Sequence, residues 1–160
     1  MKKYFALGIL SFLINAGIAQ IENINVKDLL TLTNQERSKT CKCASKKQKA
    51  VAPLIWNDVL ATAAQVQAMF LAKKKGISHV GANGSTVASR VKKLGYQWSW
   101  VGENIAKGQE SLTEVMADWM KSPGHCRNIM TGGFTEFGAA VVAAKNGQLI
   151  WVQVFATKQE

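Results

Sequence analysis

The sequence predicts a single domain of the α+β class, with helices packed on a small antiparallel sheet. Segments with the helical spacing of apolar residues come first along the chain, and strand-like segments come last. The final two strand-like segments are joined by Asn146-Gly147, a strong signal for a hairpin turn. Helices followed by a hairpin are typical of α+β folds, whereas a parallel α/β fold alternates its elements.

Residues 1–19 are expected to be a secretory signal peptide, which leaves residues 20–160 as the one domain. Lys2 and Lys3 supply the positive charge, a short apolar run covers 5–14, and small residues precede a cut after Ala19. A membrane anchor is disfavoured because this run is too short to span a bilayer, and no other segment is apolar enough. Export would place the domain where disulfides form.

The first helix is predicted over 26–37, followed by a polar, lysine-rich loop over 39–53. Asn57 is suited to cap the second helix, because its side chain can accept a hydrogen bond from the first turn. Gly76 is expected to end that helix, since glycine readily adopts the left-handed conformation found there.

Two shorter helices are predicted next. Ser85 or Thr86 begins the third, and Gly95 ends it. The fourth opens with the capping box 111–114 and is closed by Pro123. Strands are predicted near Trp98–Ile105 and at Phe137–Ala143 and Leu149–Phe155.

The chain is strongly basic, with a formal charge of +10, or +8 without Lys2 and Lys3. Much of the excess lies in 39–49 and 73–75. Such charge favours anionic partners, above all an anionic cell-envelope or lipid surface, although a solvated basic face is the plainer interpretation. Nucleic acid is not expected, because no aromatic residues interleave the lysine runs.

The cysteine count is odd, at three: Cys41, Cys43 and Cys126. One thiol would be left over in an oxidising compartment. A bond between Cys41 and Cys43 is disfavoured, because such close neighbours rarely meet disulfide geometry. A zinc site made from the three is an alternative, but its Cys-x-Cys spacing with one distant cysteine is unusual.

The two histidines of the chain both lie in turns rich in glycine and serine. His79 follows Ser78, His125 follows Gly124, and between them comes Glu103 in a Gly-Glu-Asn turn. This arrangement indicates a site built by His79, Glu103 and His125.

Several short motifs, taken in order, resemble the CAP superfamily: the cysteine-rich secretory proteins, antigen 5 and pathogenesis-related proteins, whose shared unit is the SCP domain. The resemblance is strongest to the bacterial single-domain branch and covers nearly all of residues 20–160. Each motif alone is weak, but their joint order is highly specific. The motifs are Asn34 to Arg37, Leu54-Ile55-Trp56-Asn57, Ser78-His79, Gly84-Ser85-Thr86, Arg90 to Tyr96, Gly102-Glu103-Asn104-Ile105-Ala106, Trp119, Gly124 to Met130 and Trp151 to Phe155.

The resemblance implies an α-β-α sandwich with a central cleft lined by two histidines and two glutamates. Carried over by position, the histidines are His79 and His125, and the first glutamate is Glu103. The place of the second glutamate holds Ser122, which removes one acid and weakens any mechanism that needs paired carboxylates. The same resemblance implies a Cys41–Cys126 disulfide, with Cys43 as a substitute partner for Cys126. Such a long closed loop would contribute about 4 to 5 kcal/mol in the chain-entropy model.

Two imidazoles and a carboxylate suit Zn²⁺ or another divalent cation, and some family members bind one there. Glu103 either binds the ion or accepts an imidazole N–H and fixes its tautomer. The alternative is a hydrogen-bonded cluster that ties three loops together without any ligand. A bound zinc could activate water for hydrolysis. A serine hydrolase using Ser78, Ser85 or Ser122 is disfavoured, because the chain has no Gly-x-Ser-x-Gly elbow.

Three tryptophans, Trp56, Trp119 and Trp151, are expected in the core, since they lie in motifs that resemble family scaffold. Trp98 and Trp100 alternate along a strand and are expected to share one face, which could be exposed. The resemblance also includes family members that bind lipids or sterols. That face and residues 134–137 offer only a small apolar surface for such a ligand.

The function expected from the sequence is therefore that of an exported, monomeric CAP-domain protein, secreted or periplasmic. Its His79/Glu103/His125 cleft would bind a divalent metal or a small polar ligand. Zinc-assisted hydrolysis of peptides or envelope polymers is the first alternative, and lipid or sterol binding is the second.

Overall fold

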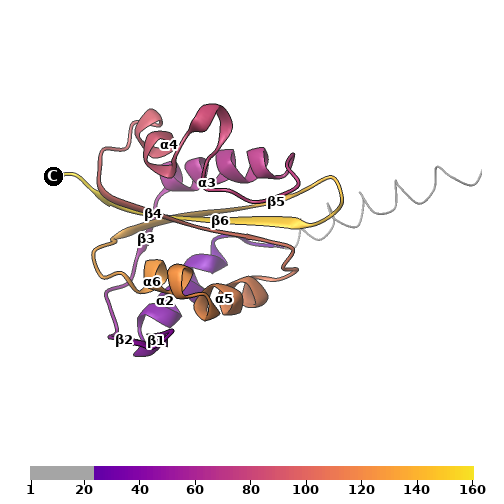
Figure 1. Ribbon diagram of the computed structural model, residues 1–160. Coiled ribbons are helices and arrows are strands. Elements are labelled where there is room, and N and C mark those ends of the chain that lie inside the picture. The colour runs from indigo at the N-terminus through magenta and orange to yellow at the C-terminus, as the bar shows by residue number, and fades with distance from the viewer. Residues whose placement is uncertain (1–23) are drawn as a thin grey trace, which may run out of the picture.

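A four-stranded sheet lies between two layers of helices in the computed structural model, which describes residues 24–160 (Figure 1). The strand order is β3-β5-β6-β4, with β3 parallel to β5 and the other pairs antiparallel. The strands are β3 (Ile55–Trp56), β4 (Trp98–Lys107), β5 (Glu136–Ala143) and β6 (Leu149–Lys158). The α-β-α sandwich that the resemblance implies is confirmed. Residues 1–19, the expected signal peptide, lie outside the described part of the chain.

One layer consists of α3 (Asp58–Leu71) and α4 (Val87–Lys93), joined by a segment that contains the short 3₁₀ helix η1 (Ala82–Gly84). Alanines fill much of the buried face of α3, so its backbone approaches the sheet closely. Gly138 on β5 completes this contact: a Cβ there would come within 3.0 Å of backbone atoms of Leu60 and Ala61. Glycine is therefore required where α3 crosses β5.

The opposite layer holds α2 (Asp28–Arg37), α5 (Leu112–Lys121) and α6 (Pro123–Met130). Its core includes Trp119 and Trp151, which are 1% and 0% exposed and so confirm two of the three predicted core tryptophans. Trp56 is only partly buried against the same cluster.

Capping residues explain where most helices begin. Asn57 Oδ1 accepts hydrogen bonds from the backbone N–H groups of Val59 and Leu60, at 2.9 and 3.2 Å. Thr86 forms a reciprocal capping box with Ser89. Ser111 Oγ accepts from Glu114 N at 3.2 Å, but the Glu114 carboxylate accepts from Glu110 N, so the predicted box at 111–114 is only half formed.

Two predicted boundaries were wrong. The expected loop over 39–53 contains a hairpin of β1 (Cys41–Cys43) and β2 (Lys46–Gln48), which Ala44 turns with a positive φ of 55°. Gly76 does not end α3, whose last residue is Leu71. Pro123 does follow the end of α5, as predicted, and it also begins α6 directly after Ser122. Proline suits the first turn of a helix, where no backbone N–H is needed for an internal hydrogen bond.

The expectation that Trp98 and Trp100 share a face was also wrong. The register of β4 against β6 shifts between these residues, and such an irregularity breaks the simple alternation of side chains. Trp98 packs with the α3 and α4 layer, while Trp100 meets Phe134 on the other side with 6.4 Å between ring centroids. The apolar surface expected from this pair is therefore divided. Within residues 24–160, no helix combines the length and apolar character needed to cross a membrane.

Candidate functional site

The three residues predicted to form the site come from three different parts of the sandwich. Glu103 lies on β4, which is the edge strand of the sheet. His79 follows α3 in one helical layer, and His125 lies in α6 in the other. Because side chains alternate along a strand, Glu103 faces the α4 layer and Asn104 faces α6. The edge strand thus links the two layers at the site.

Glu103 is buried and both its carboxylate oxygens are engaged. Its Oε1 accepts a hydrogen bond from His79 Nδ1 at 2.8 Å, and its Oε2 accepts one from Arg90 Nη2 in an ion pair. The side chains of Glu103 and Arg90 are 2% and 4% exposed, whereas that of His79 is 62% exposed. The Glu103 carboxylate is therefore fixed inside the protein, where it accepts a hydrogen bond from the exposed His79 imidazole.

The segment that carries His79 is held mainly through its backbone. Arg90 Nη1 donates to Ser85 O at 3.0 Å and to His79 O at 3.4 Å. Gln67, which is buried on α3, donates from Nε2 to Ser78 O at 2.7 Å. Arg90 therefore orients both the carboxylate that binds His79 and the loop on which His79 lies.

A chain of amides lies on the other face of β4. Asn128 Nδ2 donates to Glu103 O at 3.1 Å and to Asn104 Oδ1 at 2.8 Å. Asn104 Nδ2 donates to His125 O at 3.2 Å and to Gln153 Oε1 at 3.1 Å. These bonds attach α6, and with it His125, to the edge strand. Each amide thus binds a backbone carbonyl, in α6 for Asn104 and in β4 for Asn128, and also contacts another side chain.

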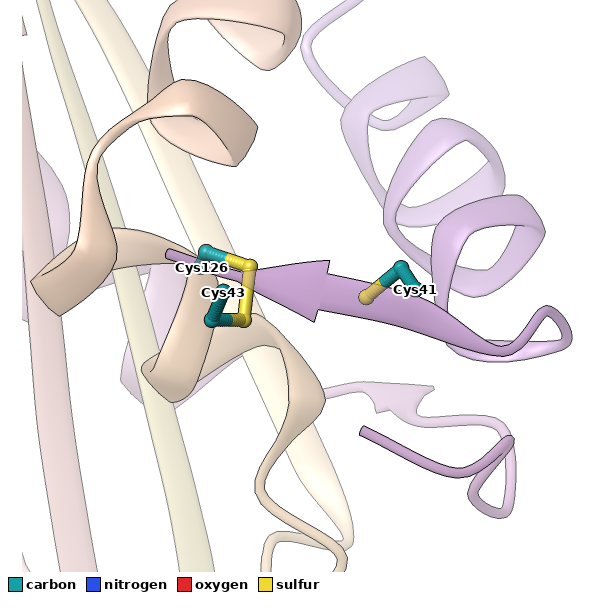
Figure 2. Close-up of side chains that lie close together, drawn as sticks. All are labelled: Cys41, Cys43 and Cys126. Atoms are coloured by element: carbon teal, nitrogen blue, oxygen red, sulfur yellow. A yellow bond between two sulfur atoms is a disulfide. The ribbon is translucent and has the colours of Figure 1, made fainter. Parts of the chain in front are cut away.

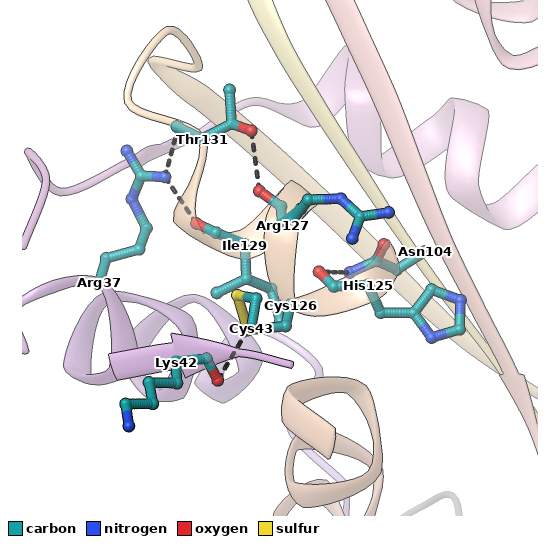
Figure 3. The surroundings of a disulfide bond; sticks show 9 residues. All are labelled: Arg37, Lys42, Cys43, Asn104, His125, Cys126, Arg127, Ile129 and Thr131. Atoms are coloured by element: carbon teal, nitrogen blue, oxygen red, sulfur yellow. Dashed lines mark hydrogen bonds between the residues drawn. A yellow bond between two sulfur atoms is a disulfide. The ribbon is translucent and has the colours of Figure 1, made fainter. Parts of the chain in front are cut away.

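The His125 imidazole is partly buried, and its ring points away from the adjacent disulfide (Figure 3). Burial lowers the pKa of His125 below 6.5, and the charge of His79 lowers it further. The ring is therefore neutral at physiological pH, as a metal ligand must be.

The hydrogen bonds at this site favour the imidazoles of His79 and His125 as metal ligands, rather than all three predicted residues. Since a carboxylate only accepts, the proton of the His79–Glu103 hydrogen bond lies on Nδ1 of His79, so in the neutral imidazole Nε2 is the nitrogen with the lone pair. Glu103 is committed to His79 and Arg90, so it suits the positioning role rather than direct binding. Ser122 lies between α5 and α6, where its backbone N–H donates to Asp118 O at 3.1 Å and its carbonyl accepts from Cys126 N at 2.9 Å.

The disulfide joins Cys43, not Cys41, to Cys126 (Figures 2 and 3). Cys43 is 1% exposed and lies against α6 with 5.5 Å between the two Cα atoms, a separation suited to a disulfide. Cys41, two residues earlier on β1, is a free, half-buried thiol. The Cys41–Cys126 prediction was therefore wrong, and the substitute partner is the one observed. Among the described residues, these three sulfurs form a group of potential metal ligands within 4.8 Å of one another.

Arg37 holds the C-terminal end of α6, although the sequence indicated only that it belonged to a motif. Its guanidinium donates to Ile129 O at 2.7 Å, Thr131 O at 2.9 Å and Ala52 O at 2.6 Å (Figure 3 shows the first two). Burial lowers the pKa of Arg37 to about 10, so the group stays charged at neutral pH. The helix that carries His125 and Cys126 is thus fixed at both ends.

A second feature of the surface is a basic hollow of about 550 Å³ beside the end of α3. Residues from the segment after α3, from the end of β4 and from the β5–β6 turn line it. Its five lysines are Lys73, Lys74, Lys75, Lys107 and Lys145.

The sequence matches the model of the cysteine-rich secretory protein (CAP) family over residues 30–155. A curated relative, the uncharacterized protein YkwD of Bacillus subtilis, is 31% identical over 132 residues. The match covers 82% of this chain and 47% of the relative, so the chain spans about half the length of that protein.

Solved structures share the fold at lower identity. An extracellular protein containing an SCP domain from Bacillus anthracis matches with a TM-score of 0.71 and 20% identity, over 98% of this chain and 45% of its own. The protein NaASP2, whose structure was solved with Zn²⁺, matches with a TM-score of 0.58 and 15% identity, over 81% of this chain and 77% of its own.

Proposed function

The chain belongs to the cysteine-rich secretory protein (CAP) family, and from that premise we propose that it is an exported binding protein whose His79 and His125 hold a divalent cation, zinc in the first instance. The observation that carries the proposal is the hydrogen-bonded chain Arg90–Glu103–His79, in which a buried ion pair fixes the tautomer of an exposed imidazole. A purely structural cluster has no need to keep one imidazole 62% exposed. The Zn²⁺ in the NaASP2 structure gives independent support for zinc as the first ion to test.

Glu103 acts in this proposal as a positioning residue. It accepts a hydrogen bond from Nδ1 of His79, so that Nε2 presents a lone pair toward the ion. His125 offers the second imidazole, and burial lowers its pKa, which favours the neutral form. Two protein ligands would leave other coordination positions of the ion open to water or to a polar group of a ligand.

Hydrolysis is not part of the proposal, because the residues present do not supply a free general base. Glu103 is bound to Arg90 and His79, and Ser122 stands where the family has its second glutamate. The site therefore supports binding better than catalysis.

Isothermal titration of zinc into the metal-stripped protein tests the proposal. The disulfide stays oxidised, and a Cys41→Ser background removes the free thiol as a competing ligand. We expect one site of micromolar or tighter affinity, lost in His79→Ala/His125→Ala. Unchanged binding in that double variant would refute the site.

Glu103→Gln separates the positioning role from direct binding. The amide oxygen can still accept a hydrogen bond from His79, but it lacks the charge of the carboxylate. Zinc affinity should therefore fall about 10- to 100-fold without being lost, which is the range seen for residues that orient a ligand. Complete loss of binding in a folded Glu103→Gln protein would instead make Glu103 a ligand.

The basic hollow supports the second part of the proposal, which is that the protein associates with an anionic envelope or lipid surface. Its five lysines concentrate positive charge in one concave place, and such a patch attracts anionic surfaces in a salt-dependent manner. Cosedimentation with vesicles containing phosphatidylglycerol should exceed that with neutral vesicles, and Lys73→Ala/Lys74→Ala/Lys75→Ala should abolish the difference. Equal sedimentation with both vesicle types would exclude this partner.

A further inference from the structure

We propose that Cys41, Cys43 and Cys126 form a thiol–disulfide exchange site, in which Cys126 is shared between a Cys43–Cys126 and a Cys41–Cys126 disulfide. The three sulfur atoms lie within 4.8 Å of one another, with the Cys41 thiol beside the existing bond (Figure 2). A leftover cysteine elsewhere on the surface would have no such neighbour. The arrangement therefore places a nucleophile next to the bond that it can attack.

The geometry of β1 makes Cys126 the shared partner. Cys41 and Cys43 are alternate residues of one strand, so both side chains point to the same face, toward α6. Lys42 between them is exposed on the other face, and its carbonyl lies 4.0 Å from Cys126 Sγ. Alternate residues of a strand are about 6.6 Å apart with parallel side chains, which disfavours a bond between Cys41 and Cys43.

The exchange step needs no external oxidant or reductant. The Cys41 thiolate attacks Sγ of Cys126, and the Cys41–Cys126 bond forms as the Cys43–Cys126 bond breaks. Cys43 leaves as a thiolate and takes up a proton from water, which balances the proton that Cys41 released. The number of disulfides and thiols is the same before and after the step.

Burial determines which disulfide predominates. After exchange, Cys43 would be a thiol at 1% exposure, where a charged form is strongly disfavoured. Cys41 has better access to water, although burial and, secondarily, the charge of Glu36 raise the pKa of its thiol. The Cys43–Cys126 form is thus the resting state, and exchange is slow at neutral pH because little Cys41 thiolate is present.

Exchange would move the attachment of the hairpin to α6 by two residues along β1. Cys126 is adjacent to His125, and α6 is otherwise fixed by Arg37 and Asn104. The three-sulfur site therefore joins the β1–β2 hairpin to the helix that carries a proposed cleft residue. This inference does not depend on metal binding in the cleft.

The experiment incubates the oxidised protein at mildly alkaline pH, quenches it in acid, and labels free thiols with N-ethylmaleimide after unfolding. Peptide mass mapping then measures the label at Cys41 and Cys43. We expect a fraction labelled at Cys43 that is at least about tenfold above that in Cys41→Ser, where the attacking thiol is absent. Label on Cys41 alone at all times would overturn the proposal, and so would Cys43 labelling whose rate depends on protein concentration.

A second variant tests the alternative pairing directly. Cys43→Ser should oxidise to a Cys41–Cys126 disulfide and leave no free thiol, while Cys126→Ser should keep two free thiols because Cys41 and Cys43 do not pair. A Cys43→Ser protein that keeps both thiols after oxidation, while still showing a native circular dichroism spectrum, would refute the shared role of Cys126.

Discussion

At the scale of single residues, Arg90 determines how the candidate site is built. Its guanidinium neutralises Glu103 inside the protein and also holds the backbone of the His79 loop. A buried ion pair contributes less net stability than its geometry suggests, because both charges are removed from water. Removing one partner is costly, however, since the other charge is then left buried without compensation.

Arg90→Met should therefore lower the free energy of unfolding by about 3 kcal/mol or more, because the Glu103 carboxylate, at 2% exposure, would lose its ion-pair partner. Urea denaturation at neutral pH measures the change. The double variant Arg90→Met/Glu103→Gln should recover a substantial part of the loss, since no unpaired charge remains. A loss in Arg90→Met below about 1 kcal/mol would show that water reaches the carboxylate.

His125 should make the stability of the metal-stripped protein depend on pH. Burial and the charge of His79 lower its pKa in the folded state, so below about pH 6.5 the unfolded chain binds a proton that the folded protein resists. Stability should then fall as the pH drops from about 7 to about 5, and His125→Gln should show a shallower fall. Calorimetric melting temperatures across this range test the sign. Parallel curves for the two proteins would contradict it.

At the scale of elements, α6 explains why the site and the disulfide are neighbours. Successive residues of a helix point in directions about 100° apart, so His125 and Cys126 face different parts of the structure. Cys126 is fully buried toward β1, while His125 remains partly exposed near the edge strand. One short helix of eight residues therefore carries both features, and its position depends on Arg37 and Asn104.

The contact of α3 with β5 gives a prediction at the same scale. Gly138→Ala would place a Cβ against the backbone of Leu60 and Ala61, and a helix backbone cannot yield as a flexible side chain can. We expect a loss of about 1 to 3 kcal/mol, as for an overpacked core. Gly124→Ala is the matched control, because a Cβ at Gly124 meets nothing within 4 Å. Equal thermal melting of the two variants would contradict the close approach.

At the scale of the whole molecule, the sequence predicted the fold class, the main helices and the β5–β6 hairpin, because apolar periodicity and capping residues report local structure directly. Asn57 and Thr86 cap helices as expected. The hairpin at 41–48 was missed, since its lysines carry no apolar pattern and it is joined to α6 through Cys43. Such a long-range bond leaves no local signal.

The site was predictable in part for the same reason. His79, Glu103 and His125 stood out by residue type, but the expected turns at two of them were wrong, since Glu103 lies on β4 and His125 lies in α6. The role of Arg90 was not visible, because a helical arginine at this position is indistinguishable from a solvated one until the packing of α4 on β4 is known. The choice between Cys41 and Cys43 also depended on tertiary packing, since both lie on the same face of one strand.

The Cys43–Cys126 bond spans 83 residues, and His79, Glu103 and His125 all lie inside the loop that it closes. That loop also contains the exposed lysines at 73–75, an obvious target for a trypsin-like protease. One cut there should give a single band on a gel without reductant and two bands after reduction; two bands without reductant would contradict the covalent link. A protein cut at these lysines would thus keep the fragment with α2 and α3 joined to the fragment that carries His79, Glu103 and His125.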